Sequence, residues 1–523
     1  MALILVSCSK APEAESPHSR EVHHGMIELG EKLNDPYTVD NMQKALSKVY
    51  PTKAERIDIH PTDYYVRFLP ADDAQLKRLE DSGLYLMDHP MDYRIKREGD
   101  YYMDPSLADD AITWQYAVVP RDYEFPEDIR HEVLDRCYIS EHDPYTRAMD
   151  IDWLQVEKES FVLTGNGALW EQDVKSGVSA APKGRITFSD PAFCDGRPVG
   201  VAGVTVACNV FVKVALATTD RDGYYKMETS FSSDPRYRLV FKNTAGFSIG
   251  LNLVLIPASV STLGSGTPAG IDFTVTESGN AALFRRTAVN NAAYDYITRC
   301  NPDDLDISAP PKDLRIWIIP FLRESSAPML HHGTVLDQGL VKEYVGKYAA
   351  PVALFAPDVT IGTKDGQSFA DIYASTVHEM AHTSHFVKAG SELWTPYIAY
   401  ILKSFVMESG ALYGSGPDTS FSAGVELFQK GAGVCEISEM WAYFVAASMH
   451  KERYGGSMPS YPAWMWFRPE ILGYLYERGT SRGEIFRALG ADVCDLAAFK
   501  KELLRLYPER DYMINQAFAA YGK

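Results

Sequence analysis

The sequence predicts a multidomain α+β protein, with a small α+β region at the N-terminus, a β-sandwich after it and a mainly helical domain at the C-terminus. Three observations support this prediction. The chain has 523 residues, enough for about two to four domains. Residues 176–279 form short strand-like runs between turns, with almost no helical periodicity. Residues 280–523 contain long apolar runs with helical spacing.

The composition is that of an ordinary globular protein, with 46% hydrophobic and 23% charged residues. The net charge is −19. Binding to nucleic acid or to an anionic membrane surface depends on clustered Lys and Arg, so the charge argues against both as main partners. A protein or peptide partner is compatible with this composition, and the sequence does not indicate an oligomeric state.

Residues 1–22 are expected to form a lipoprotein signal remnant and a polar tether. Leu5-Val6-Ser7-Cys8 resembles a bacterial lipobox, in which the cysteine carries the lipid. Residues 9–22 are polar, with Pro and Glu, as in a flexible linker. No run elsewhere reaches 18 apolar residues. We therefore expect an exported protein, held at the bacterial cell envelope only by a lipid anchor.

Residues 23–175 are predicted to form the small N-terminal α+β region. Residues 30–49 and 71–81 have helical spacing, and residues 63–70 alternate as in a strand. Shorter strands are expected at 84–87 and 93–97. No cluster of residues in this region has a catalytic pattern.

Residues 176–279 are predicted to form the β-sandwich, and residues 261–267 are expected to be a loop rich in Ser and Gly. The run 219–225 contains Asp220, Gly223 and Tyr225, in which the glycine supplies the positive φ of a tight turn. This hairpin resembles the carboxypeptidase regulatory-like, transthyretin-type fold. The expected strands are 183–188, 199–208, 210–219, 224–229, 237–241 and 271–275.

Residues 280–523 are predicted to form the functional domain. A helix is expected at 280–299, followed by buried strands at 314–320 and 352–355. The next helix runs from about residue 368 to 386, with Ser368 or Asp371 as its cap. Residues 388–431 are rich in Gly and aromatic residues and are expected to form a cleft wall. Residues 434–447 are too apolar for a solvated helix, and further helices are expected over 469–506.

The 368–386 helix contains an HExxH motif, from His378 to His382. Residues four apart lie on one face of a helix, so two imidazoles can reach a single Zn²⁺. Glu379 lies beside the metal, where a carboxylate can take a proton from zinc-bound water. The extended form of the motif is absent, because His385 and Lys388 occupy its Gly and third His positions.

The third metal ligand is predicted to be Glu439, which lies deep in the apolar 434–447 run. A carboxylate there needs a partner, because burying an unpaired charge is costly. Glu436 lies one turn earlier on the same face and remains the alternative. It could also hold a ligand histidine. The remaining alternative is that both glutamates lie at the edge of the helix and form salt bridges with Arg or Lys.

Amide hydrolysis also needs a hydrogen-bond donor for the tetrahedral oxyanion. Tyr397, Tyr443, Tyr461 and His385 are the candidates, and we take Tyr443 and His385 as the expected catalytic partners of Glu379. His331-His332 is another candidate for the cleft, although exposed surface residues are the simpler interpretation.

The HExxH motif and the downstream Ser438-Glu439 resemble the gluzincin class of zinc metallopeptidases. The resemblance implies a zincin-like fold, a zinc cofactor, metal ligands His378, His382 and Glu439, and Glu379 as general base. Tyr443 replaces the Asp that orients a ligand His in thermolysin-type members. The layout of the whole chain is similar to zinc metallopeptidase lipoproteins of Bacteroides-type bacteria.

These expectations favour a zinc-dependent endo- or exopeptidase at the cell surface. The alternative is a surface lipoprotein that binds glycan or protein and carries a non-catalytic zinc site. Six cysteines besides Cys8 form no CxxC or zinc-finger pattern, and only Cys194 and Cys208 lie near each other within one predicted domain. Their even number is compatible with disulfides, but the spacing does not assign a pair.

Overall fold

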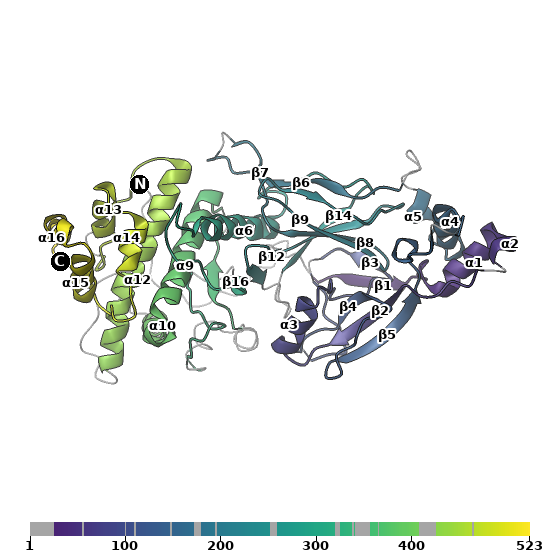
Figure 1. Cartoon of the computed structure of the whole chain (residues 1–523), viewed down its shortest axis with the longest axis horizontal. Coiled ribbons are helices and arrows are strands. Elements are labelled where there is room, and N and C mark those ends of the chain that lie inside the picture. The colour runs from purple at the N-terminus through teal and green to yellow at the C-terminus, as the bar shows by residue number, and fades with distance from the viewer. Residues whose placement is uncertain are drawn as a thin grey trace, which may run out of the picture.

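The computed structural model is elongated, with the N-terminal elements at one end, strands in the middle and the C-terminal helices at the other end (Figure 1). The expected lipobox cysteine Cys8, the tether 1–22, Cys194 and the expected strand 352–355 lie outside the described residues. The structure describes residues 26–54, 57–99, 101–108, 111–146, 149–171, 179–193, 196–250, 259–319, 325–336, 339, 356–364, 366–406, 425–462 and 465–523.

The N-terminal region is an α+β unit built on a three-stranded antiparallel sheet in the order β4-β2-β5. The expected strand 63–70 is the central strand β2 of this sheet, and the expected helix 71–81 is also confirmed. The expected strand at 84–87 is wrong, because only Met87 forms a bridge there, to Tyr116. The elements are β2 (Asp63–Leu69), α3 (Asp73–Asp81), β4 (Gln115–Pro120), β5 (Arg130–Cys137), α4 (Trp153–Leu163) and α5 (Gly167–Glu171).

The helix expected over 30–49 is wrong in its first part. β1 (Glu28–Lys32) pairs with β3 (Tyr93–Arg97), and α1 (Val39–Val49) begins only after the N-cap Thr38. Pro36 explains the break, since it disfavours the helical conformation at the residue before it. That residue, Asp35, instead accepts a hydrogen bond from the Tyr37 backbone N–H at 2.8 Å.

The middle of the chain forms two four-stranded sheets whose buried faces share one hydrophobic cluster. The first has the order β10-β6-β15, with β7 paired to β6, and the second has the order β14-β11-β8-β9. The strands are β6 (Lys183–Phe188), β7 (Val199–Gly200), β8 (Thr205–Val210), β9 (Lys213–Thr218), β10 (Tyr224–Lys226), β11 (Arg236–Val240), β14 (Val260–Ser265) and β15 (Phe273–Val275). The expected strand 199–208 is therefore two strands with a turn between them.

Two glycines in this region had predicted roles, and the structure confirms one prediction and contradicts the other. Gly223 has φ +84°, and a Cβ would lie 2.1 Å from the Ile186 carbonyl oxygen, so the expected turn is confirmed. The loop expected at 261–267 is wrong, because most of it is strand β14. At Gly266 a Cβ would lie 2.2 Å from the Ile271 side chain, so this glycine allows close packing rather than a flexible loop.

A third sheet crosses the boundary expected between residues 279 and 280. Its order is β12-β13-β16-β17, from β12 (Lys242–Asn243), β13 (Phe247–Gly250), β16 (Leu314–Ile319) and β17 (Val359–Gly362). β13 pairs with β16 in parallel, and β16 pairs with β17 in parallel. All six residues of β16 are buried, as expected for a strand covered on both faces.

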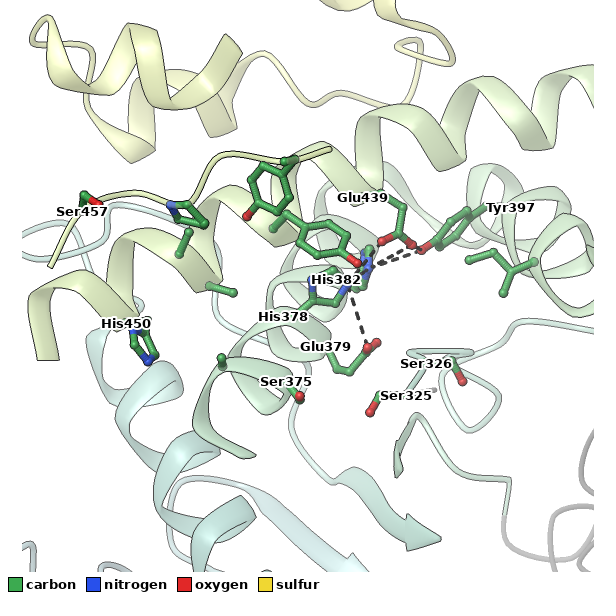
Figure 2. A pocket seen from close by; sticks show the side chains of 17 residues that line it. Ser325, Ser326, Ser375, His378, Glu379, His382, Tyr397, Glu439, His450 and Ser457 are labelled. Carbon is green, nitrogen blue, oxygen red and sulfur yellow. Dashed lines mark hydrogen bonds and ion pairs between the residues drawn. The ribbon is translucent and has the colours of Figure 1, made fainter. Parts of the chain in front are cut away.

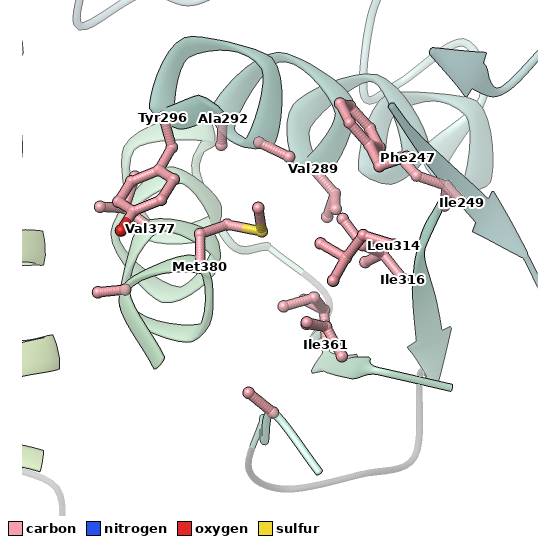
Figure 3. Packing of buried hydrophobic residues seen from close by; sticks show 14 of the residues in the cluster. Phe247, Ile249, Val289, Ala292, Tyr296, Leu314, Ile316, Ile361, Val377 and Met380 are labelled. Carbon is pink, nitrogen blue, oxygen red and sulfur yellow. The ribbon is translucent and has the colours of Figure 1, made fainter. Parts of the chain in front are cut away.

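The third sheet carries the helices that position the candidate site. α6 (Ala281–Arg299) begins at its N-cap Asn280 and packs against α9 (Phe369–Ala389). Figure 3 shows Val289 of α6 and Met380 of α9 both pointing toward Leu314 of the third sheet. The remaining helices are α10 (Ser391–Val406), α12 (Val425–Tyr454), α13 (Glu470–Glu477), α14 (Arg482–Arg487), α15 (Leu496–Leu506) and α16 (Asp511–Ala520).

Among the described residues, Cys137, Cys208, Cys300, Cys435 and Cys494 all have free thiols. Cys208 is buried, and its sulfur lies 3.4 Å from that of Met227. None of the described helices combines the length and the hydropathy needed to span a bilayer.

Candidate metal centre

The structure brings together the two histidines of the HExxH motif and the predicted third ligand. The Nε2 atoms of His378 and His382 lie 3.2 Å apart. The Glu439 carboxylate lies 3.3 Å from His378 Nε2 and 3.6 Å from His382 Nε2. The ligand atoms of the three residues all lie within 4.8 Å of one another. This is a possible metal-binding group formed by two helices.

The capped helix α9 holds the two histidines in position. Ser368 accepts a hydrogen bond from the Asp371 backbone N–H, and the Asp371 carboxylate accepts one from the Ser368 backbone N–H. This capping box satisfies two of the N–H groups that a helix start leaves without partners. His378 and His382 then lie one turn apart on the face that meets α12.

α12 packs antiparallel to α9, which brings the carboxylate to the histidines. His382 is level with Glu439, and the ring centroid of His378 lies 4.5 Å from that of Tyr443. Trp441 ties the helices together, since its Nε1–H donates to the Ala381 carbonyl at 3.2 Å. Later residues of α9 therefore meet earlier residues of α12, as in any antiparallel pair of helices.

The alternative ligand Glu436 has a different partner. Its carboxylate accepts a hydrogen bond from Lys523 Nζ at 2.5 Å, near the end of the chain. Of the two glutamates that the sequence leaves open, the structure places Glu439 at the histidines and Glu436 in an ion pair.

The protonation states fit a divalent cation. Burial lowers the pKa of His382 to about 3, so its imidazole is neutral at pH 7. Burial would raise the pKa of Glu439, but the neighbouring His382, His378 and Tyr397 outweigh it and lower that pKa, so the carboxylate is ionised. A metal requires neutral imidazole and ionised carboxylate, and this donor set of two nitrogens and one carboxylate suits zinc.

Tyr397 of α10 orients the carboxylate. Its hydroxyl donates to a Glu439 oxygen at 3.0 Å and lies 3.4 Å from His382 Nε2. Burial and the Glu439 charge raise the pKa of Tyr397, so the hydroxyl keeps its proton and stays a donor. The sequence suggests Tyr397 as an oxyanion donor, whereas this contact makes it a positioning residue for Glu439.

Replacing Tyr397 with Phe is expected to weaken the binding of a metal ion such as zinc to this group by about 10- to 100-fold, the usual effect of losing a residue that orients a metal ligand. The fold should persist, because Phe retains the ring packed against Trp394 at 4.8 Å. Competition with a fluorescent chelator measures the affinity. Tyr400→Phe is the matched control, since this buried tyrosine of the same helix does not line the cavity. Unchanged zinc affinity in Tyr397→Phe would contradict the positioning role.

A cavity of about 510 Å³ opens beside the metal group (Figure 2). Glu379 lines it, is 4% exposed and has its carboxylate 4.0 Å from His378 Nε2. Ser325 and Ser326 also line the cavity, and Ser326 pairs antiparallel with Thr360 of β17. Glu379 therefore faces the space that a ligand of the metal would occupy.

The other expected catalytic residues differ in their positions. Tyr443 and Tyr461 line the cavity, with ring centroids 5.4 Å apart. His385 does not line it: the residue is 1% exposed, and its Nδ1 lies 2.9 Å from the Ser438 hydroxyl. The structure therefore places His385 behind the residues that line the cavity, next to the residue that precedes Glu439, and its catalytic role stays a prediction. His332 is also outside the cavity and bonds to Asp358 at 2.9 Å.

Sequence reasoning missed several cavity residues. Ser325, Ser326 and Ser457 come from segments without a motif. His450, however, continues the stripe of Glu439, Tyr443 and Ala446 along α12. These positions follow helical spacing on one face, so that spacing was a signal that could have identified His450.

Comparison of the chain with protein-family models, with curated proteins and with solved structures found no match.

Proposed function

We propose that this protein is a zinc-dependent peptidase of the gluzincin type. The observation that carries the proposal is the convergence of His378, His382 and Glu439 beside a cavity that also holds Glu379. Two imidazoles and one carboxylate are the donor set of catalytic zinc sites, in which a fourth position stays open for water or substrate. The open cavity on the Glu379 side supports such a position.

Zinc at this group would lower the pKa of a water molecule and polarise a peptide carbonyl. Glu379 would take the proton of the attacking water and pass it to the leaving amine nitrogen. Its carboxylate lies next to His378 and is not part of the metal group, so it can hold a proton without losing a ligand role. Tyr443 or Tyr461 would donate a hydrogen bond to the oxyanion, since both line the cavity.

The surrounding fold supports the same proposal. α9 follows a partly parallel sheet, and α12 supplies the carboxylate, as the expected zincin-like arrangement requires. The two four-stranded sheets and the Gly223 turn fit the expected carboxypeptidase regulatory-like domain. With a lipid anchor at Cys8, the enzyme would act on protein or peptide at the cell envelope.

The proposal is tested by measuring metal and cleavage in the same preparation. The purified protein is expected to contain one zinc per chain and to cleave casein or a broad peptide mixture. Treatment with a chelator should abolish cleavage, and added zinc should restore it. Tight zinc binding without cleavage of any peptide would contradict the peptidase proposal and favour a binding protein with a structural zinc. Protein that binds no zinc would contradict the metal site.

A further inference from the structure

The cavity extends well beyond the metal group. Figure 2 shows His450 and Ser457 at one end, Tyr397 at the other, and His382 with Glu439 between them. Tyr443 is level with His378, and His450 lies seven residues further along α12. At 1.5 Å per residue, this distance is roughly 10 Å along the helix axis. The length is sufficient for a long side chain that starts beside the metal.

Small residues create this space. Ala374 and Ser375 of α9 line the cavity, and Ala446 and Ala447 of α12 lie opposite them. Each is about one or two turns from a metal-group residue, on the same face of its helix. A larger side chain at any of these positions would project into the cavity.

The charges of the cavity are unfavourable to an acidic ligand. Among the described residues that line it there is no Lys or Arg, whereas Glu379 and Glu439 are both present. At the far end of the cavity, burial lowers the pKa of His450. The charge of Asp371 opposes this shift but does not cancel it, so the imidazole is neutral at pH 7. A carboxylate placed beside His450 would meet no Lys or Arg among the described residues that line the cavity, and the charge of Asp371 would repel it.

The β-sandwich holds the far end in place. The ring centroid of His450 lies 4.7 Å from that of Tyr454, whose hydroxyl donates to Asp190 at 2.9 Å. Asp190 lies just after β6 and also pairs with Arg453 at 3.5 Å. The middle region of the chain thus supports the segment of α12 that closes the cavity.

We propose that this cavity is a subsite, closed by His450, that accepts a bulky uncharged side chain of the peptide substrate and rejects an acidic one. The proposal deepens the peptidase function above and rests on it for the identity of the substrate. His450 is a specificity-determining residue here, because it lies at the end of the side-chain site and away from the metal group.

Binding of hydroxamic acids tests the subsite without requiring catalysis. The probes are acetohydroxamic acid, phenylpentanohydroxamic acid and the para-carboxy derivative of the latter, titrated calorimetrically into the zinc-loaded Glu379→Gln protein. The phenyl compound is expected to bind at least about tenfold more tightly than its carboxy derivative, the usual scale of side-chain discrimination in an apolar pocket. Acetohydroxamic acid has no tail and reports the metal alone.

Filling the cavity should remove this difference. Ala447→Phe is expected to bring the two tailed probes to equal affinity while leaving acetohydroxamic acid unchanged. Ser375→Leu blocks the cavity from α9, and zinc content with thermal unfolding checks that each variant is folded. Lys451→Ala is the control, because Lys451 neighbours His450 on α12 without lining the cavity.

A second readout uses cleavage of a peptide library. Wild type should favour bulky uncharged residues at one position beside the cleaved bond, and Ala447→Phe should lose that preference.

Equal affinity of wild type for the two tailed probes, or an unchanged difference in affinity in Ala447→Phe, would overturn the subsite. A difference in affinity between the two tailed probes, without cleavage of any peptide, would support the subsite and overturn the peptidase function instead. Zinc-loaded protein that binds no hydroxamate would overturn both.

Discussion

The Glu379→Gln variant is expected to retain zinc and to lose about two to four orders of magnitude in the rate of peptide hydrolysis, the usual contribution of a general base. Glutamine matches glutamate in size and shape, but its amide cannot take a proton from water. Glu379 is not one of the three residues of the metal group, so zinc content should not change. The rate of casein or peptide cleavage and elemental analysis measure the two effects.

The matched control for Glu379→Gln is Ser375→Ala, which changes another residue of α9 that lines the cavity. It removes a hydroxyl that has no part in the proposed proton transfer, so its rate should stay within a few fold of wild type. A Glu379→Gln variant that holds zinc and cleaves casein as fast as wild type would exclude Glu379 as the base.

The residues of the site could be predicted from sequence mainly where the pattern that identifies them lies within a single helix. The HExxH spacing, the Ser368 cap and the apolar run around Glu439 are all local patterns, and the structure brings their residues together. The choice between Glu436 and Glu439 depended on depth within the apolar run. The ion pair of Glu436 with Lys523 could not be predicted, because 87 positions separate the two residues.

The roles of tyrosine and histidine near the metal group depend on contacts that no local pattern encodes. Tyr397 reaches Glu439 because α10 folds back against α12, a contact between positions 42 residues apart. His385 fails as a cavity residue because its helix turns it toward Ser438. Sequence spacing places a residue on a helix face, but the packing of neighbouring helices decides which face lines the cavity.

The errors in the fold have a related cause. The Ser- and Gly-rich stretch of β14 has the composition of a loop, yet the edge of β11 pairs with it. β13 follows the sandwich strands along the chain but pairs with β16, on the far side of the expected boundary. In both cases long-range pairing outweighs local propensity. The strands and helices with strong periodicity, such as β2, β16 and α6, were predicted close to their observed bounds.

Removal of the proposed third ligand should have the largest effect on metal binding. Glu439→Ala is expected to lower zinc affinity by more than about 100-fold, beyond the 10- to 100-fold effect usual for residues that only orient a ligand. The two imidazoles alone leave a tetrahedral ion with an incomplete set of protein ligands. The variant should therefore lose both zinc and peptidase activity. Elemental analysis after dialysis and chelator competition measure the change.

Thermal unfolding provides an independent readout of the same site. A ligand present at 100 times its dissociation constant stabilises a folded protein by about 2.7 kcal/mol. Wild type should therefore unfold at a higher temperature when zinc is added, and Glu439→Ala should lose most of this shift. Glu436→Ala is the control: it removes only the partly exposed ion pair with Lys523, worth at most about 1 kcal/mol, and should keep the zinc-induced shift. Equal zinc content and equal zinc-induced shifts in Glu439→Ala and wild type would show that Glu439 is not a ligand, and the hydrolase proposal would then lose its metal site.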